Sequence, residues 1–357
     1  MAMIRTEYWI TGLQKLVRSI KYSCVSCLRY SGKVEEQVMA PLPLERLKPS
    51  PPWYFTGLDL FGPFHIKGEV NQRTSGKGYA VIFTCLTTRS VFVDIATDYS
   101  TDAFLLVFRR FVSLRGYPCK IFSDSGSQLK GASKEINEIF KCIEWDKVQE
   151  VGVVEGLEWK FSPGDAPWYN GCCEALIRSI KKSIYHAIGS NRLTYMELQT
   201  ILYESANLIN ERPVGVTPTS VDDGSFLCPN DILLGQSTNK VPAGDFDSTL
   251  NSRKRIYFIQ RLTDAFWRKW TQCYFPSLLQ RPKWHHTKRN VCKGDVVVLQ
   301  DKNLRRGQWK LGIVTDALLG NDNIVRRVIV KYINPTSNTP IEVERPVQRL
   351  VVLLAIN

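Results

Sequence analysis

The chain has 357 residues, of which 44% are hydrophobic and 23% charged, and its formal net charge is +13. This is an ordinary globular composition, and the length allows two or three domains with a substantial core. No apolar run reaches about 18 residues and no signal peptide opens the chain, which predicts a soluble intracellular protein without a membrane partner. The ten cysteines are scattered, which argues against a secreted disulfide framework.

The first 48 residues are predicted to form a helical segment and a linker. Apolar residues recur at helical spacing over 8–20, and prolines crowd the tract 30–52. Between them, Cys24 and Cys27 form a CxxC pair, which is half of a tetrahedral Zn²⁺ site. All four histidines follow Cys27, so the site is incomplete here. Either its other ligands lie upstream, or the site is lost and the pair is two reduced thiols.

Residues 49–225 show the pattern of a mixed α/β core. Gly62-Pro63 is expected to stop the first strand, Gly76-Lys77-Gly78 to form a loop, and Pro213 to end the last helix. Three strands, a helix and a fourth strand that ends at an acidic residue match an RNase H-like fold, a five-stranded mixed sheet with flanking helices. The predicted strands are 54–61, 78–86, 90–96, 119–123 and 157–161, and the predicted helices are 101–115, 128–148 in part, 174 onward and 194–211.

Three acidic residues have settings that suit metal ligands. Asp59 lies within an apolar strand, where a charge is costly unless it is paired or binds a metal. Asp124 directly follows another strand, and Glu174 lies at the start of a helix. Because Mg²⁺ prefers carboxylate ligands, these three are the predicted catalytic residues and the predicted ligands of two Mg²⁺ ions, with Mn²⁺ as the substitute. Asp165 is the nearest competing carboxylate, but its loop setting suits the role less.

A basic face continues from Glu174 along its helix. Arg178 and Lys181 fall on the same face as Glu174 at helical spacing, and Lys182 follows them. These three basic residues are predicted to contact a phosphate backbone. Cys172-Cys173, just before Glu174, is interpreted as a pair of small packing residues.

Residues 226–280 are predicted to be a connector followed by a basic, aromatic helix. The aromatic side chains of 253–280 recur at helical spacing and are expected to pack in a core. Residues 251–310 hold 15 Lys and Arg against 3 Asp and Glu, a surplus of 12 that nearly equals the charge of the whole chain. Such a stretch favours a nucleic-acid partner, and a solvated basic surface is the plainer alternative.

Residues 281–357 alternate like a small SH3-like β-barrel. Strands are predicted at 294–299, 307–314, 326–332 and 344–347, with turn residues between them. The basic side chains near the second of these strands are predicted phosphate contacts, and an ordinary solvated hairpin face is the alternative. They are Lys302, Arg305, Arg306 and Lys310.

Together these motifs resemble the retroelement integrases of the Asp-Asp-Glu type, most of all those of BEL/Pao retrotransposons. The resemblance runs from about Tyr8 to Leu353. The 49 residues between Asp124 and Glu174 exceed the retroviral spacing, and the surplus reads as an insertion within 133–160. The matching phrases are Thr56–Pro63, Ile121–Gly126, Phe161–Pro163, Trp168–Gly171 with Glu174, Asn210–Pro213, Cys228–Gly235 and Phe266–Trp270.

The resemblance implies a metal-dependent polynucleotidyl transferase that trims the 3′ ends of element DNA and joins them to target DNA. It implies work in the nucleus as a homo-oligomer on DNA, a C-terminal domain that binds DNA without sequence preference, and an N-terminal zinc domain. Other classes remain open: a nuclease of the same fold, a domesticated or inactive DNA-binding protein derived from a transposon, or a fragment with a structural role. Strand transfer, cutting alone, or binding without chemistry would distinguish them.

Overall fold

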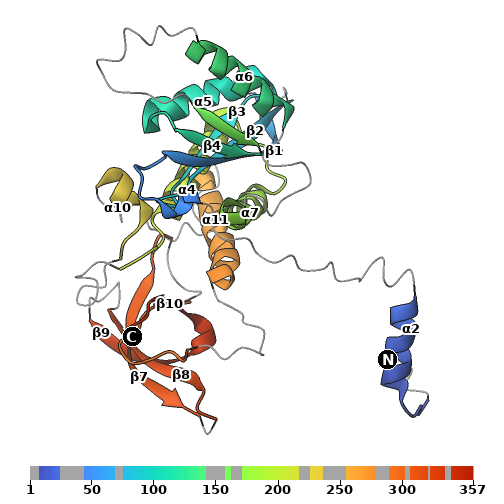
Figure 1. The fold of residues 1–357 in the computed structure, drawn as a ribbon, viewed down its shortest axis with the longest axis vertical. Coiled ribbons are helices and arrows are strands. Elements are labelled where there is room, and N and C mark those ends of the chain that lie inside the picture. Colours follow the sequence, from blue (N-terminus) through green and yellow to red (C-terminus); the bar gives the residue numbers. More distant parts are fainter. Residues whose placement is uncertain are drawn as a thin grey trace. The chain divides into compact units, whose positions relative to one another are not determined.

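The computed structural model describes most of the chain (Figure 1). Within its helices, the side chains of residues 137, 139–141, 171–175, 276 and 277 are not described. Residues 1–42 and 43–357 form two separate units, each treated by itself. The described residues are 8–24, 44–68, 75–124, 126–141, 157–161, 171–216, 226–235, 255–278, 289–301, 306–320, 322–333 and 339–356.

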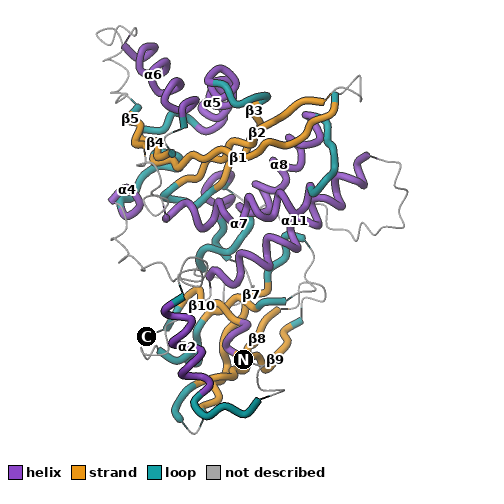
Figure 2. The backbone as a smooth tube through the Cα atoms, turned by 90° about the vertical axis from the view of Figure 1, so that its right-hand side faces the viewer, coloured by secondary structure: helices purple, strands orange, loops and turns teal. Residues whose placement is uncertain are grey.

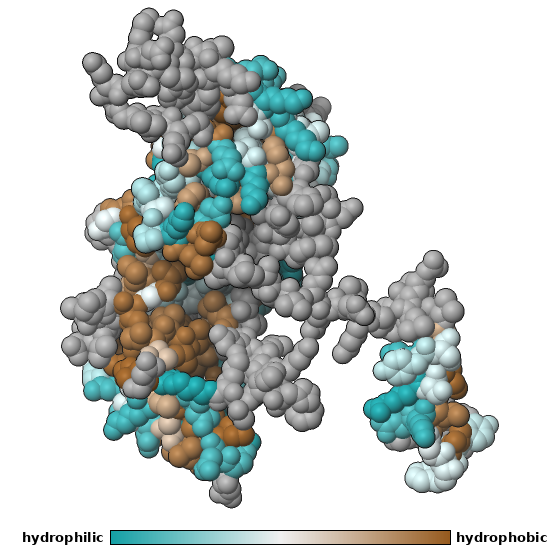
Figure 3. Space-filling model, viewed as in Figure 1, coloured by the Kyte–Doolittle hydropathy of each residue, from teal (hydrophilic) through white to brown (hydrophobic). Residues whose placement is uncertain are grey.

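The first unit contains the helix α2 (Leu13–Ser23). Figure 3 shows polar residues on one side of α2 and apolar residues on the other. On the apolar side, Leu16 and Ile20 remain 54% and 59% exposed. Cys24 follows the helix and is half-buried, whereas Cys27 lies outside the described residues. The zinc half-site therefore stays a prediction.

The second unit is built on a five-stranded mixed sheet with the strand order β3-β2-β1-β4-β5. β2 pairs antiparallel with both β1 and β3, while β4 runs parallel to β1 and β5 parallel to β4. This order and these directions are those of the RNase H-like fold, so that prediction is confirmed. The strands are β1 (Phe55–Lys67), β2 (Ser75–Cys85), β3 (Val91–Ala96), β4 (Lys120–Ser123) and β5 (Glu158–Phe161).

Helices cover both faces of this sheet (Figure 2). α5 (Thr101–Arg115) and α6 (Ser127–Lys141) pack on one face, in a cluster that includes Leu58 of β1. The opposite face packs against α7, α8 and α11, in a cluster that includes Phe61 of β1. Alternate residues of β1 thus point to different layers, as the two-residue period of a strand requires. The second layer consists of α7 (Gly171–Ile188), α8 (Tyr195–Asn210) and α11 (Arg255–Leu278).

β1 does not stop at Gly62-Pro63, so that expectation is wrong. The strand continues to Lys67, with a register shift between Phe61 and Phe64, and Phe64 pairs with Gly78. An irregularity of this kind accommodates a proline, which has no N–H to donate to the ladder. The expected loop at 76–78 is likewise part of β2. A Cβ at Gly78 would lie 2.3 Å from Ile66 Cδ1 and 3.0 Å from Ile95 Cδ1, so side chains of the two neighbouring strands fill the space beside this glycine.

α11 belongs to the core even though it follows a long connector. Phe266 and Trp270 are fully buried and Trp267 is 3% exposed, all in the cluster that contains α7 and α8. The aromatic stripe is therefore packing, as its spacing predicted. Arg255 also forms an ion pair with Glu197 of α8. Two short helices, α4 (Leu44–Leu47) and α10 (Pro229–Leu234), complete the described helices of this unit.

The C-terminal residues form a five-stranded antiparallel sheet of the SH3-like kind, with the order β10-β6-β7-β8-β9. The sequence analysis missed its last strand, which follows the short 3₁₀ turn Val347–Arg349. None of the described helices is long and apolar enough to span a membrane. The strands are β6 (Val296–Leu299), β7 (Lys310–Leu319), β8 (Val325–Ile333), β9 (Pro340–Pro346) and β10 (Leu350–Leu354).

Candidate active site

The register of two parallel strands brings Asp59 and Asp124 together. Gly57 of β1 pairs with Phe122 of β4. Two residues further along each chain stand Asp59 and Asp124, so the two acids lie at the same level of neighbouring strands. Adjacent strands lie about 4.8 Å apart, which puts these carboxylates within reach of one shared cation.

Both carboxylates point to the face of the sheet that α7 covers. Asp59 has the same parity as Phe61, and Asp124 the same parity as Phe122. Phe61 and Phe122 are both buried in the cluster that contains α7 and α8. Asp59 is 27% exposed, and Asp124, just beyond the end of β4, is exposed. The site therefore opens to solvent at the end of β4.

The charge of Asp124 affects the pKa of Asp59. Burial raises the pKa of the Asp59 carboxyl above its ordinary value, and the negative charge of Asp124 raises it further, while the ammonium group of Lys181 opposes both effects. Two carboxylates this close repel each other when both are ionised. A cation placed between them would relieve that repulsion.

Lys181 of α7 reaches this site directly. Its Nζ lies 2.6 Å from Asp59 Oδ2 and 3.3 Å from the carbonyl oxygen of Leu60, to both of which it donates. It also lies 5.6 Å from the centre of the Phe61 ring. One turn later, the hydroxyl of Tyr185 donates to the carbonyl of Gly62 at 3.2 Å. α7 therefore lies along β1 with its polar stripe turned toward Asp59.

Glu174 begins the same stripe. It lies in the first turn of α7, seven residues before Lys181, which is almost two full turns and about 10 Å along the axis. Its side chain is outside the described residues, as are those of Cys172 and Cys173. Leu176, Ile177, Ile180 and Ile184 are buried on the other side of the helix, as their spacing predicted. The backbone thus puts Glu174 on the helix face that meets Asp59, and its carboxylate position remains a prediction.

These residues fit a hard divalent cation. Two carboxylates at one level of a sheet supply the oxygen ligands that Mg²⁺ and Mn²⁺ take. Among the residues that the structure describes, no three His, Cys, Asp or Glu side chains cluster as a metal site, which is the result expected when the Glu174 carboxylate is outside the description. Asp165, the competing carboxylate, also lies outside it.

The remaining basic residues of α7 face solvent. Arg178 and Lys182 are both exposed, and Lys181 is 26% exposed. Their exposure is consistent with contact to a polyanion. Lys181 was predicted to have the same role, and its ion pair with Asp59 was not predicted. The spacing between Glu174 and Lys181 was the signal that Lys181 shares the site.

Some of the basic side chains of 251–310 pair with the acids of the same stretch, which leaves its surplus of 12 unchanged. Its three acids each hold a partner: Asp264 with Arg306 at 3.3 Å, Asp295 with Arg289 at 2.8 Å and Asp301 with Lys310 at 2.5 Å.

Two of the predicted phosphate contacts are among these pairs. Arg306 is only 6% exposed and also donates to Gln260, so in this structure it docks the turn before β7 onto α11 and does not face a ligand. Lys310 is held by Asp301 and the Tyr332 ring. Lys302 and Arg305 lie outside the described residues. The phosphate-binding role thus loses support at Arg306 and stays a prediction elsewhere.

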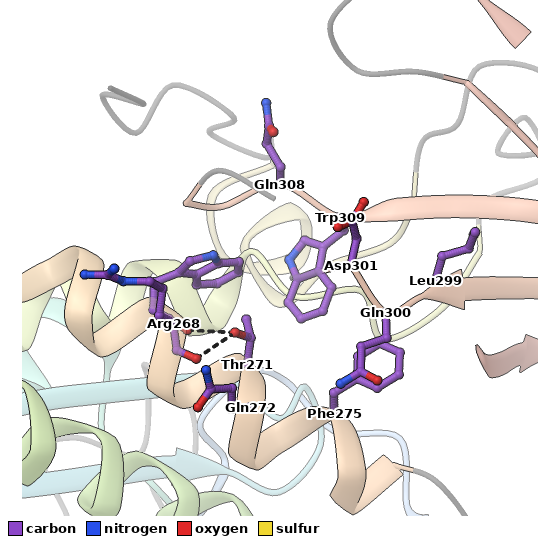
Figure 4. Close-up of a pocket in the computed structure, with 10 residues that line it drawn as sticks. Arg268, Thr271, Gln272, Phe275, Leu299, Gln300, Asp301, Gln308 and Trp309 are labelled. Atoms are coloured by element: carbon purple, nitrogen blue, oxygen red, sulfur yellow. Dashed lines mark hydrogen bonds between the residues drawn. The ribbon is translucent and has the colours of Figure 1, made fainter. Parts of the chain in front are cut away.

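A pocket of about 110 Å³ separates α11 from the C-terminal sheet (Figure 4). The hydroxyl of Thr271 points along its wall and donates to the carbonyls of Trp267 and Arg268. The indole N–H of Trp309 is buried and has no acceptor among the residues that the structure describes. Neither Asp59 nor Asp124 is among the described residues that line this pocket. The lining residues are Trp267, Arg268, Thr271, Gln272, Phe275, Leu299, Gln300, Asp301, Gln308 and Trp309.

The chain was compared with known proteins. Residues 254–353, which comprise α11 and most of the C-terminal sheet, match the model of a family of unknown function, DUF5641. No curated protein matches the chain.

Three solved structures align with low scores. A chain of the simian T-cell lymphotropic virus intasome in complex with PP2A regulatory subunit B56 gamma is 13% identical, with a TM-score of 0.33, over 100% of this chain and 95% of its own. The HTLV-2 integrase catalytic core with magnesium gives 15% and 0.32 in its dimeric form, over 51% of this chain and 97% of its own. The trimeric form gives 13% and 0.30, over 47% and 92%. Scores of this size carry no weight here, and the fold stands on its strand order and packing.

Proposed function

We propose that the chain is a metal-dependent polynucleotidyl transferase of the integrase type that acts on DNA. One observation carries the proposal: Asp59 of β1 and Asp124, directly after the adjacent parallel strand β4, each follow the pair Gly57–Phe122 by two residues, Asp59 contacts α7, and the first turn of α7 contains Glu174. An acid within β1, an acid beyond β4 and an acid that opens a helix are the three positions at which the sequence motifs resemble an integrase.

Asp59, Asp124 and Glu174 would hold Mg²⁺ or Mn²⁺, which when bound neutralises charge on the attacking and leaving oxygens of a phosphodiester. The protein's own contribution is positioning. The sheet sets the two aspartates side by side, and the exposed Arg178 and Lys182 offer cations to the DNA backbone next to them. No side-chain nucleophile is needed, because water or a DNA 3′-hydroxyl attacks the phosphorus.

The sequence resemblance extends this proposal to retrotransposon integration of the BEL/Pao kind. On that reading the chain trims the ends of element DNA and then joins them to target DNA, in the nucleus, as a homo-oligomer assembled on DNA. The C-terminal SH3-like sheet would add DNA contacts that do not depend on sequence.

The test uses the purified full chain, Mg²⁺ or Mn²⁺, and a labelled DNA duplex that carries the element end. Strand-transfer products that disappear in Asp59→Asn, Asp124→Asn and Glu174→Gln support the proposal, with a loss of at least about 100-fold expected when one metal ligand is removed. Asp102→Asn is the matched control, since Asp102 is an exposed acid on α5. It should leave the yield of products unchanged.

The other outcomes separate the alternatives. Cutting without joining identifies a nuclease of the same fold. Binding that survives Glu174→Gln, with no chemistry in the unmodified chain, identifies a DNA-binding protein derived from a transposon. Equal activity in all the acid variants would overturn the assignment of the site.

A further inference from the structure

Lys181 occupies one carboxylate oxygen of Asp59, a residue proposed to hold the cation. Its Nζ donates to Asp59 Oδ2 at 2.6 Å, and the carbonyl of Leu60 and the Phe61 ring hold the same ammonium group from two other directions. The contact crosses 122 residues of sequence and joins α7 to β1. Both side chains are about a quarter exposed, so the ion pair lies at the rim of the site, where an incoming solute can reach it.

We propose that Lys181 and a divalent cation compete for Asp59, so that Lys181 sets the metal affinity of the site and leaves Asp59 when the cation binds. This inference rests on the proposed function, because it takes Asp59 to be a metal ligand. It adds a regulation of that site, in which cation loading and the release of a basic side chain are one event.

The physical reason is electrostatic. The pair Gly57–Phe122 stands two residues before Asp59 and Asp124, so the two carboxylates lie near each other and their like charges repel. One ammonium group offsets part of that repulsion, and a doubly charged ion offsets more. If both cations shared Asp59 Oδ2, they would lie within about 4 Å of each other, in a partly buried setting where their repulsion is poorly screened. This repulsion favours the departure of the ammonium group.

The released side chain has a place to go. The ammonium group of Lys181 is at the end of a long flexible side chain. Lys181 is next to the exposed Lys182 and three residues from the exposed Arg178. Once it leaves Asp59, the helix face presents one more positive charge to a DNA backbone. Linkage then requires that the divalent cation and DNA strengthen each other's binding, by the same factor in both directions.

The opposite arrangement makes the opposite prediction. If Lys181 stays on Asp59 and orients its carboxylate for the metal, it acts as a supporting hydrogen-bond partner, and its removal weakens metal binding. The sign of the change in metal affinity therefore decides between displacement and support.

The experiment is calorimetric titration of the full chain, without DNA, with Mn²⁺ and with Mg²⁺. Lys181→Met keeps the length of the side chain and removes its charge. Displacement predicts about five- to tenfold tighter metal binding in this variant, the size expected for one partly exposed charged hydrogen bond. Lys134→Met, an exposed lysine of α6, is the matched control for a general change of one charge and should shift the affinity less than twofold. Unchanged or weaker binding in Lys181→Met overturns the inference.

Two further measurements keep the outcomes distinct. Asp59→Asn should lose the binding isotherm. If neither the unmodified chain nor Lys181→Met shows binding that depends on Asp59, the proposed function fails, whereas binding with the wrong sign at Lys181 removes only this inference. In the unmodified chain, the NMR signal of the Lys181 ammonium group, assigned by its loss in Lys181→Met, should move toward the solvent-exposed position on addition of Mg²⁺. A signal that does not move would contradict displacement, whatever the metal affinity of the variant.

Discussion

At the residue scale, the side chain of Asn210 pairs with backbone groups of an edge strand. Its side-chain amide accepts from the N–H of Val91 and donates to the C=O of Val91, both at 2.8 Å, and the residue is 4% exposed. Val91 begins the edge strand β3, whose other side pairs with β2. Asn210 therefore satisfies backbone groups of β3 that no strand reaches, and it fastens the end of α8 to the sheet.

Removing that amide should be costly. Asn210→Ala leaves a buried N–H and a buried C=O of Val91 without partners, and we expect the free energy of unfolding to fall by about 2–4 kcal/mol. Urea denaturation of the full chain measures this loss. Thr200→Ala, at an exposed position of the same helix, should change stability by less than about 0.5 kcal/mol. An equal effect of both substitutions would show that Asn210 does not hold β3.

Asp295 is the second residue whose environment makes a prediction. Burial would raise the pKa of its carboxyl, but Arg289 and the backbone N–H groups of Cys292 and Ile356 donate to it, and the net effect is a lowered pKa. A lowered pKa in the folded state means that the carboxylate stabilises the protein above its unfolded pKa of about 3.9. This stability is lost as the pH falls through the folded value.

The pH dependence can be isolated with one substitution. Asp295→Asn should cost about 1–3 kcal/mol at pH 7, because hydrogen bonds to a charged group are lost. The difference between the two proteins should shrink as the pH falls below about 4, since Asp295 is then protonated in the unfolded chain, and it should vanish once the folded chain takes up the proton at lower pH. Denaturation series at several pH values, followed in the full chain, measure it. A difference that stays constant over this range would rule out Asp295 as its source.

At the element scale, the C-terminal sheet depends on how closely its strands approach. Gly312 of β7 lies opposite Tyr332 of β8. A Cβ at Gly312 would meet the Val330 side chain at 2.5 Å and the carbonyl oxygen of Lys331 at 2.9 Å. A backbone carbonyl cannot move aside as the end of a side chain can, so this glycine is required by packing.

Gly312→Ala should therefore destabilise the C-terminal sheet by about 1–3 kcal/mol, the usual cost of inserting a methyl group where no space exists. Gly76→Ala is the control, because a Cβ at Gly76 in β2 meets nothing within 4 Å. Hydrogen exchange of β7 and β8 in the full chain is the measurement. Equal protection of these strands in both variants would contradict the packing argument.

At the scale of the whole molecule, the helical layer over the candidate site is completed by a helix from much later in the chain. α11 packs on α7 and α8 through Phe266, Trp267 and Trp270, while Trp309, just before β7, packs edge-on against Trp267 at 5.5 Å. The family match at 254–353 joins the same helix to the C-terminal sheet. α11 is thus part of the wall behind the candidate site as well as the start of the C-terminal module.

Removing the largest buried side chain of α11 should destabilise the core. Trp270→Ala, at a fully buried position, should lower the free energy of unfolding by about 3–5 kcal/mol and reduce the hydrogen-exchange protection of α7. Trp9→Ala is the control, since Trp9 is 90% exposed in the first unit. If α7 keeps its protection in Trp270→Ala, α11 does not support the site.

The sequence alone determined the features that depend on local patterns of residues. Strand and helix periods and turn residues predicted the order of the elements and the RNase H-like fold. They also selected Asp59, because a charge in an apolar strand needs a reason. The Gly62-Pro63 pair misled, because local chemistry predicts a stop and a bulge in the paired strands absorbs it.

Only the tertiary structure decided which distant residues meet. The ion pair of Lys181 with Asp59 spans 122 residues, and the amide pair of Asn210 with Val91 spans 119. Arg306 changed from an expected surface contact to a buried partner of Asp264. No period or spacing encodes such pairs, because they depend on how layers stack after the chain has folded, and each side chain looks locally like an ordinary solvated residue. The pair Asp59 and Asp124 needed both the sequence and the tertiary structure. The sequence motifs identified the two acids, and the parallel register of β1 and β4 brought them side by side.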